Sequence, residues 1–295
     1  MERRGSLIKI SGELLAPNYL LQLRDIFESD NLKKEDYREV KELLISLAKK
    51  ASRGIEYDRV QQIASEIAMV PRSENTGIVI GAGNLWRGAL NPDFDRNEAD
   101  NIGMLATVMN ANALKVVLNE MGKKAVVLTA SEMPQFGEYY TTTSMNRAFS
   151  EGNIVIFSGG TGNAWCSTDT AAAIRALNMN ADRLIKLTNV DGVYNKDPKK
   201  YPDAKKYQVI TYEDALTNPN IRIMDDGALS LCQENKLPII VIGTDDNYYD
   251  FRSAIIGWIQ KIGTFIADVE KTLTYEEVEK KSLSMIYRRY DKPCE

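Results

Sequence analysis

Seven short runs of aliphatic and β-branched residues recur along the chain, and they constrain its fold more than any other feature. The runs span residues 7–10, 78–80, 125–128, 154–157, 184–187, 239–242 and 264–267. Their length and composition are typical of buried strands, and helical patterns separate several of them. Strands that alternate with helices favour an α/β fold, a three-layer α/β/α sandwich with a mostly parallel central sheet. In such a sheet, ligands bind beyond the carboxyl ends of the strands.

The helical segments set the expected domain organisation. An almost continuously apolar segment from Asp100 to Met121 predicts a well-buried helix, with Asp100 as its N-cap and Gly122 as its stop. Residues 17–70 exceed what one crossover helix needs, and two apolar stripes at helical spacing predict a helical insertion there. The stripes are Val40, Leu43, Leu44, Leu47 and Ala51, and then Val60, Ile63, Ala64 and Ile67. We expect one domain over residues 1–267, followed by a charged extension over 268–295 with a helix at 275–289.

The chain has 295 residues and no histidine, which narrows its chemistry. A histidine-assisted serine or cysteine nucleophile and a histidine-ligated zinc are both excluded. Cys166, Cys232 and Cys294 have no metal-binding spacing and favour a reducing compartment. With 37 basic and 41 acidic residues, the net charge of −4 argues against nucleic acid or a membrane as the main partner. No apolar run approaches the roughly 20 residues of a membrane span, so we expect a cytoplasmic protein.

Three glycine-rich loops follow predicted strands. The first includes Lys9, the second runs from Gly81 to Gly88 with Arg87 near its end, and the third covers residues 158–170. Glycine turns let backbone N–H groups approach an anion, and the third loop enters a helix near Thr170, where the helix dipole adds attraction. The dinucleotide motif fails because Trp86 stands where it needs glycine, and no Walker string is present.

Two segments also have a purely structural interpretation. Thr168 and Asp169 could cap a helix N-terminus and have no other role. Asp191 and Asp197 could likewise serve simply as turn residues. Against that stands the set of cations Lys9, Arg87 and Lys186 at predicted strand ends, without any nucleophile–base pair. Phosphoryl transfer needs little more than such cations and aligned anions, so this set favours it.

The loops, taken in order, closely resemble those of the bacterial uridylate kinases of the amino-acid kinase superfamily. The residues that carry the resemblance are Lys9–Glu13, Gly81–Gly88, Gly103–Asn110, Thr161–Asn163, Thr168–Ala173, Lys186–Pro198 and Leu237–Val241. The resemblance implies the amino-acid kinase fold and the reaction of ATP with UMP to give ADP and UDP in pyrimidine biosynthesis. It also implies Mg²⁺ as cofactor and a homo-hexamer as the assembly.

The resemblance also implies site residues. Catalytic roles fall to Lys9, Arg87, Asp169 and Lys186, with Mg²⁺ carried mainly by the ATP phosphates and with Asp169 able to reach it through water. ATP contacts fall to Lys9, Ser11, Gly12, Gly83, Arg87, Thr188, Asn189, Tyr194 and Asp197. UMP contacts fall to Ala82, Asp100, Thr161, Gly162, Asn163, Ala164, Trp165, Cys166, Ser167 and Thr168.

This chain departs from the family in the acceptor region. Ala82 stands where the family has glycine, and the family usually has Pro-Phe-Phe-Thr where this chain has Ala164, Trp165, Cys166 and Ser167. Two alternatives therefore stay open beside UMP kinase. One is a kinase of another small phosphate acceptor, such as CMP or a non-nucleotide phosphate. The other is a non-catalytic nucleotide sensor or an oxyanion-storage protein.

Overall fold

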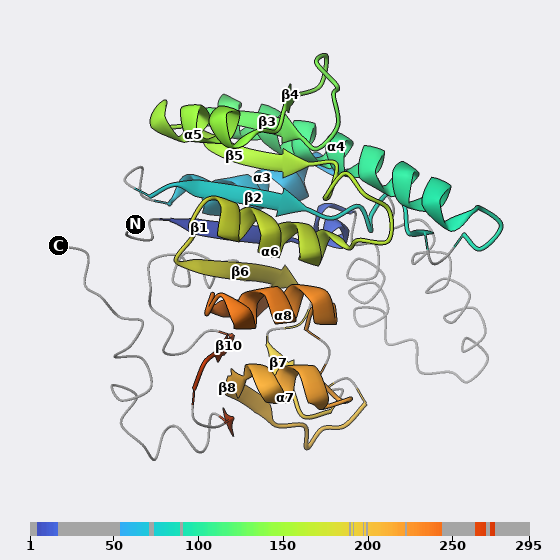
Figure 1. Ribbon diagram of the computed structural model, residues 1–295, viewed down its shortest axis with the longest axis vertical. Helices are drawn as coiled ribbons and strands as arrows, with labels where there is room; N and C mark the ends of the chain where they lie inside the picture. The colour runs from blue at the N-terminus through green and yellow to red at the C-terminus, as the bar shows by residue number, and fades with distance from the viewer. Residues whose placement is uncertain are drawn as a thin grey trace, which may run out of the picture.

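One sheet organises the described part of this computed structural model (Figure 1). The described residues are 5–16, 54–70, 74–88, 91–188, 190, 192–196, 198, 200–221, 223–243, 263–269 and 272–274. The strands are β1 (Ser6–Ile10), β2 (Thr76–Ile80), β3 (Ala125–Thr129), β4 (Glu138–Tyr139), β5 (Ile154–Ser158), β6 (Arg183–Thr188), β7 (Val193–Tyr194), β8 (Lys206–Thr211), β9 (Ile239–Gly243), β10 (Thr264–Ala267) and β11 (Leu273–Thr274). The helices are η1 (Gly12–Leu15), α3 (Tyr57–Ala68), α4 (Arg96–Glu120), α5 (Thr142–Ser150), α6 (Thr168–Asn178), α7 (Tyr212–Thr217) and α8 (Asp226–Glu234).

The sheet is mostly parallel, as predicted. Its order is β11-β8-β10-β9-β6-β1-β2-β5-β3-β4, with β7 paired to β8. Every pair from β9 through β6, β1, β2, β5 and β3 to β4 is parallel, whereas β9–β10, β8–β11 and β7–β8 are antiparallel. All seven predicted strands are present. The carboxyl ends of β2, β5 and β6 point to one edge of the molecule, where α4 begins (Figure 1).

Two cores, one on each face of the sheet, confirm the three layers. Helices α5, α6, α7 and α8 cover the near face in Figure 1, while α3 and α4 lie behind the sheet. Alternation along β1 divides its side chains between the faces, because neighbouring residues of a strand point in opposite directions. Ile8 and Ile10 belong to the core with α3 and α4, whereas Leu7 belongs to the core with α6 and α8.

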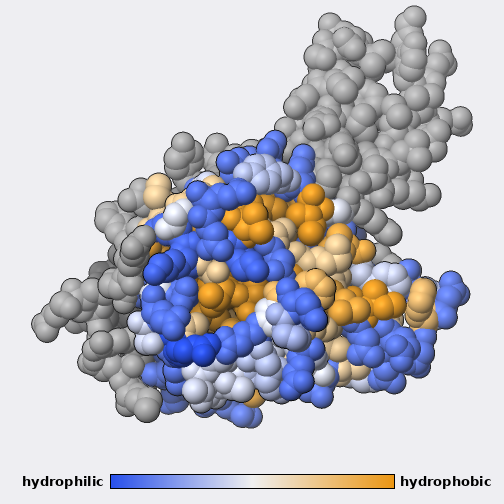
Figure 2. Space-filling view, turned by 90° about the horizontal axis from the view of Figure 1, so that it is seen from above, coloured by the Kyte–Doolittle hydropathy of each residue, from blue (hydrophilic) through white to orange (hydrophobic). Residues whose placement is uncertain are grey.

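Helix α4 differs from its prediction at its start and in its burial. It begins at Arg96, because Asp95 accepts hydrogen bonds from the N–H groups of residues 97 and 98; Asp100 lies inside the first turns and is not the N-cap. The helix ends before Gly122, as predicted, with a φ of +73° at that glycine. Only one side is buried, and Leu105, Met109 and Val116 are about half exposed. Hydrophobic side chains lie among polar ones on the face that carries α4, α5 and β4 (Figure 2).

Within the described ranges, α4 is the one helix whose length and composition would let it cross a membrane. The same test is passed by core helices, and α4 packs against α3, β3 and β5.

Part of the predicted insertion is described. Helix α3 buries Val60, Ile63, Ala64 and Ile67, which confirms the second apolar stripe. The first stripe, at residues 40–51, and the predicted helix at 275–289 lie outside the described residues.

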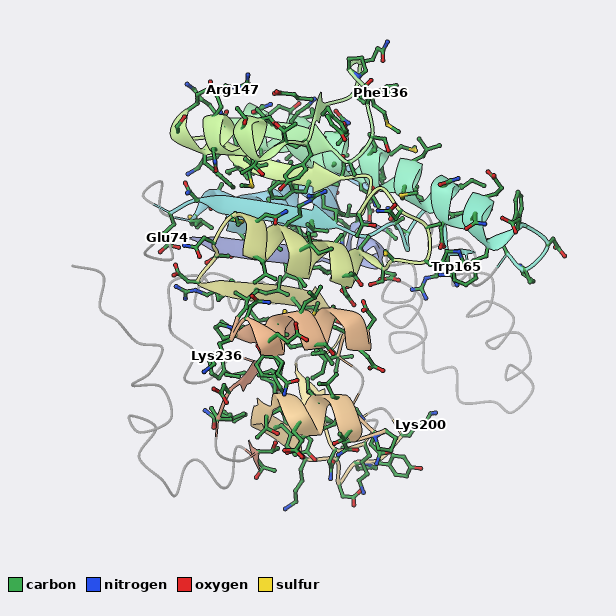
Figure 3. The ribbon with its side chains drawn as sticks, in the orientation of Figure 1. Glu74, Phe136, Arg147, Trp165, Lys200 and Lys236 are labelled. Carbon is green, nitrogen blue, oxygen red and sulfur yellow. The ribbon has the colours of Figure 1, made fainter. Side chains whose placement is uncertain are left out.

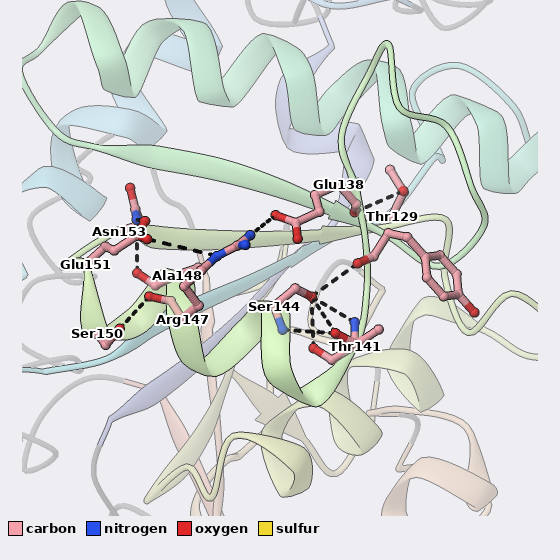
Figure 4. Close-up of polar contacts among 10 residues, drawn as sticks. Thr129, Glu138, Thr141, Ser144, Arg147, Ala148, Ser150, Glu151 and Asn153 are labelled. Carbon is pink, nitrogen blue, oxygen red and sulfur yellow. Dashed lines mark hydrogen bonds and ion pairs between the residues drawn. The ribbon is translucent and has the colours of Figure 1, made fainter.

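Local capping chemistry orients α5 at the sheet edge (Figure 4). The Thr141 hydroxyl accepts from the Ser144 N–H at 2.9 Å, and the Ser144 hydroxyl accepts from the Thr141 N–H at 2.9 Å. This reciprocal capping box satisfies two N–H groups that the helix itself leaves unpaired. Arg147, in the last turn, pairs with Glu138 of β4 and so ties the helix to the edge strand.

Candidate active site

Two lysines and one aspartate form the centre of the site. Lys9 of β1 and Lys186 of β6 are paired in register on neighbouring strands and point to the same face of the sheet, toward α6. Asp169, in the first turn of α6, forms an ion pair with the Lys9 Nζ through Oδ1 at 2.9 Å, and its Oδ2 accepts a hydrogen bond from the Lys186 Nζ at 2.8 Å. Both lysines are buried, with exposed fractions of 6% and 9%. We call these three residues the lysine–aspartate cluster.

The electrostatics of this cluster follow from burial and from the neighbouring charges. Burial would raise the pKa of the Asp169 carboxyl, but the charges of Lys9 and Lys186 outweigh burial and hold that pKa below its usual range. For Lys186, burial lowers the pKa and the charge of Lys9 lowers it further, against the attraction of Asp169. Two like charges facing each other on adjacent strands repel. Asp169 therefore holds together a pair of cations that would otherwise not share this space.

The positions of these lysines correct one expectation. Lys9 and Lys186 lie inside β1 and β6, one and two residues before the strand ends, and their Nζ atoms reach Asp169 in the first turn of α6. Helix α6 begins at Thr168, and its N-cap is Ser167, whose hydroxyl accepts from the N–H groups of Asp169 and Thr170. Neither Thr168 nor Asp169 is the cap, so the capping interpretation of Asp169 is wrong.

Asp225 is a charged neighbour of the site that the sequence did not single out. It is the N-cap of α8, accepting from the Ala228 N–H at 2.9 Å. Its carboxylate also accepts from the Ser167 hydroxyl and from the Thr170 hydroxyl at 3.0 Å. Lys186 donates as well to the carbonyl of Ile223, two residues earlier. These contacts connect the start of α8 to the start of α6. The sequence signal that could have identified Asp225 was its place directly before a helical pattern.

The first two glycine loops pack backbone against backbone. A Cβ on Gly12 would lie 2.6 Å from the Gly81 carbonyl oxygen and 2.7 Å from the Gly83 nitrogen, which no side chain tolerates. A Cβ on Gly83 would meet the Glu13 carboxylate, which pairs with Arg87. The Arg87 side chain, which was predicted to bind phosphate, therefore pairs with Glu13, and about half of it is exposed.

A pair of buried asparagines holds the second loop against α4. Asn84 and Asn110 exchange side-chain hydrogen bonds of 2.9 and 2.7 Å, and Asn110 also donates to the Gly81 carbonyl at 2.8 Å. Both are almost fully buried. Thr107, one turn earlier, accepts from the Gly159 N–H at 2.8 Å. The Gly103–Asn110 motif thus positions the second and third glycine loops at once, a role that its sequence pattern did not reveal.

The third loop depends on left-handed backbone. Gly159, Gly160 and Gly162 have φ values of +78°, +60° and +82°, a region that glycine enters without strain. Thr161 caps the turn by accepting from the Asn163 N–H at 3.1 Å. Trp165 has the same backbone sense, with a φ of +67°, and its N–H donates to Asp100 Oδ2 at 2.8 Å. The predicted acceptor residues Asp100 and Trp165 are therefore in direct contact.

The remaining predicted residues are distributed around this centre. Ser11 follows β1 and donates to the Leu187 carbonyl at 3.0 Å. Thr188 ends β6, and Tyr194 lies in β7. Ala82 accepts the turn hydrogen bonds of residues 85 and 86 through its carbonyl, and the Cys166 thiol is exposed. Asn189 and Asp197 lie outside the described residues.

Among the described residues, no three acidic or thiol side chains converge to hold a metal ion. The Asp169 carboxylate already faces two ammonium groups. This donor set suits a divalent cation that is held by the phosphates of a nucleotide, since hard cations of this kind are commonly bound through substrate phosphates.

Comparison with known proteins agrees with this geometry. The model of the amino acid kinase family matches residues 7–243. The uridylate kinase of Rickettsia canadensis is 45% identical over 196 residues, covering 65% of this chain and 81% of that protein. The chain belongs to the uridylate kinases of the amino acid kinase family. The uridylate kinase of Rickettsia conorii is 47% identical over 191 residues, covering 64% of this chain and 78% of that protein.

Solved structures place the family's fold on nearly the whole chain. The UMP kinase from Bacillus anthracis superposes with a TM-score of 0.74 at 31% identity, covering 93% of this chain and 99% of that one. The UMP kinase from Ureaplasma parvum gives 0.72 at 30% identity, covering 91% and 100%. The resemblance to the uridylate kinases and the amino-acid kinase fold are therefore confirmed.

Proposed function

We propose that this chain transfers the γ-phosphoryl group of ATP to UMP, giving ADP and UDP. Its membership of the uridylate kinases supports the reaction and the acceptor. The lysine–aspartate cluster is the observation in the molecule that carries the chemistry. Two buried cations that share a single carboxylate leave one positive charge without a counter-charge, which is costly unless a further anion binds beside them. A transferring phosphoryl group, whose charge spreads over three oxygens, is such an anion.

The transfer is direct and in line. An oxygen of the UMP phosphate attacks the γ-phosphorus while the bond from that phosphorus to the bridging oxygen of ADP breaks, and the electron pair leaves with ADP. Lys9 and Lys186 stabilise the equatorial oxygens, and Asp169 keeps both ammonium groups aimed. No described nucleophile–base pair is present at this cluster, so the step proceeds without a phosphoenzyme.

The substrates are assigned to the two sides of the cluster. We assign ATP to Lys9, Ser11, Gly12, Gly83, Arg87, Thr188 and Tyr194, together with Asn189 and Asp197. We assign UMP to Ala82, Asp100 and residues 161–168. When bound, Mg²⁺ neutralises the ATP phosphates and arrives with them. Cytoplasmic location, a homo-hexamer, and a catalytic domain over residues 1–267 with an extension beyond it are parts of the same proposal.

The test is ADP release from purified protein with ATP and Mg²⁺, using UMP, CMP, dUMP and no acceptor side by side. Strong turnover that depends on UMP is expected. Selective turnover of CMP would show that CMP, not UMP, is the acceptor, and would assign that selectivity to the loop around Trp165. Tight ATP and UMP binding with no turnover on any acceptor would support the sensor and overturn the kinase. Lys9→Ala and Lys186→Ala should each lower kcat more than they raise the Kd for UMP.

A further inference from the structure

Trp165 combines an unfavourable backbone with an exposed side chain. Its φ of +67° lies in the left-handed region, which a residue with a Cβ adopts only when its surroundings hold it there. Its side chain is 68% exposed, so core packing does not supply that constraint. Figure 3 places it at the edge where the strands end and α4 begins. Something other than burial must keep this residue in place.

Polar contacts to the start of α4 supply the constraint. The Trp165 N–H donates to Asp100 Oδ2 at 2.8 Å, and the indole Nε1–H donates to Asn97 Oδ1 at 2.8 Å. The Arg96 guanidinium carbon lies 4.9 Å from the centroid of the indole ring, within the range of a cation–π contact. Arg96 also donates to Asp100 Oδ2 at 2.9 Å, which closes the set. None of these contacts to Arg96 or Asn97 was predicted from the sequence.

The same set reaches the second glycine loop. A Cβ on Gly88 would lie 3.3 Å from Asp100 Oδ1, so the carboxylate sits against that loop end on its other side. Asp100, which lies in α4, therefore contacts both the second loop and the third loop. These are the three segments assigned above to UMP, and the inference that follows rests on the proposed function.

We propose that Trp165 is a positioning residue that latches the third loop onto α4 and so sets the affinity for the UMP acceptor. The acceptor-loop latch consists of Arg96, Asn97, Asp100 and Trp165. The indole N–H and the ring fix the loop, and the backbone N–H orients Asp100 toward the acceptor. Lys9 and Lys186 lie on β1 and β6, and Asp169 follows the latched part of the loop inside the first turn of α6. None of these three described residues contacts Arg96, Asn97 or Trp165, so the latch acts on acceptor binding more than on the transfer itself.

The decisive pair of variants is Asn97→Ala and Trp165→Phe. Asn97→Ala removes the acceptor of the indole N–H, and Trp165→Phe removes its donor together with one of the two indole rings while keeping a phenyl ring against Arg96. Each should raise KM for UMP about two- to tenfold, the cost of one lost hydrogen bond, and the double variant should raise it no further than the larger single effect. For Asn97→Ala, kcat and KM for ATP should stay within about twofold.

Phe136→Leu is the matched control, because Phe136 is also an exposed aromatic residue, 56% exposed, on the loop before β4 and away from Trp165 (Figure 3). It should leave both KM values unchanged. Unchanged KM for UMP in Asn97→Ala and Trp165→Phe, or equal changes in both KM values, would overturn the latch. Far-UV circular dichroism and the Tm verify that each variant is folded.

A titration of intrinsic fluorescence with UMP, without ATP, separates the latch from the proposed function. UMP should change the emission of the wild type, and Asn97→Ala, which keeps every tryptophan, should shift the titration to a Kd for UMP about two- to tenfold higher. That shift without ADP release would leave the latch and reject the kinase. Turnover of UMP with equal Kd values in the wild type and Asn97→Ala would leave the kinase and reject the latch, and neither turnover nor response would reject both.

Discussion

The lysine–aspartate cluster and the acceptor-loop latch lie at the same edge of the sheet and are built in opposite ways. The cluster buries two cations and one anion between two strands and a helix. The latch holds an exposed tryptophan through two hydrogen bonds that its backbone and indole N–H groups donate to one helix end. Removing any one charge of the cluster should strongly destabilise the protein, because a buried charge without a partner costs far more free energy than an exposed polar group without one. Sensitivity to substitution should therefore follow burial.

The largest effect should come from Asp169→Asn. Removing the carboxylate leaves Lys9 and Lys186 buried and facing each other without a counter-charge. We expect a loss of about 3–5 kcal/mol in the free energy of unfolding and a fall in kcat of at least about a hundredfold. Denaturant unfolding and steady-state kinetics measure both. Asp203→Asn breaks the exposed pair with Lys196 and is the matched control, with no expected change in either quantity.

A fall of less than tenfold in kcat for Asp169→Asn would remove the basis for contrasting the two regions. It would mean that the two lysines keep their positions without the aspartate.

The pH dependence of kcat sharpens the contrast next. The pKa of Lys186 is lowered from 10.5, so its ammonium loses its proton at a pH below that value. The site then has only one cation, and kcat should fall. The depressed pKa of Asp169 works at the other end: its contribution to stability is full above the ordinary carboxyl pKa and is lost only as pH falls through the lower folded value. We expect an alkaline limb in kcat without an acid limb from Asp169 near neutral pH.

Lys186→Arg tests the assignment of that limb. Arginine stays charged to much higher pH, so the limb should move upward even though the larger side chain lowers kcat. An alkaline limb that stays in place would belong to another group.

Asn110→Ala should have the next largest effect. It leaves the Asn84 Oδ1 and the Gly81 carbonyl oxygen without the donor Asn110, while the Asn84 amide nitrogen still donates to Gly54; each unsatisfied oxygen costs about 1–3 kcal/mol of stability. Since this pair anchors the second glycine loop, KM for the nucleotides should rise together with the loss of stability. Asn112→Ala is the control, because the half-buried Asn112 side chain donates to the Val108 carbonyl and accepts from Lys115, both within the same helix. Equal stabilities of the two variants would contradict the anchoring role.

Glu13→Gln should change little. Glu13 and Arg87 are 32% and 50% exposed, so losing their ion pair should cost at most about 1 kcal/mol. With the competing carboxylate neutralised, Arg87 becomes available to a phosphate, and the KM for ATP or UMP should fall a few-fold, most clearly at low salt. A rise in KM would show instead that Glu13 holds Arg87 in its working position.

The smallest effect concerns the thiols. Burial raises the pKa of Cys232 to about 12, so this thiol should not react with a disulfide reagent at pH 8 in the folded protein. The exposed Cys166 should react and should be protected by UMP. Cys166→Ser, compared with Cys232→Ser, should lose one fast-reacting thiol. Labelling of Cys166 at equal rates with and without UMP would place the acceptor elsewhere.

Much of the fold, and the residue types that the candidate site brings together, could be predicted from the sequence. The seven apolar runs became strands whose bounds differ from the predicted ones by at most two residues, because short β-branched runs are typical of buried strands. The glycine loops and the two lysines were identified by chemistry, and the family by its motifs. The start of α4 was misplaced because Asp95 and Asp100 are both capable caps, and only the path of the preceding loop decides between them.

The sequence by itself determined the parallel sheet, its two apolar faces and the supply of cations, since these depend on periodicity and residue type. The tertiary structure alone decided which groups meet. It brought Asp169 between two lysines 177 positions apart in the chain, as the register of β1 with β6 requires. It also set Trp165 against Asn97 and turned Arg87 toward Glu13. Such contacts depend on strand order and loop paths, which local preference does not encode.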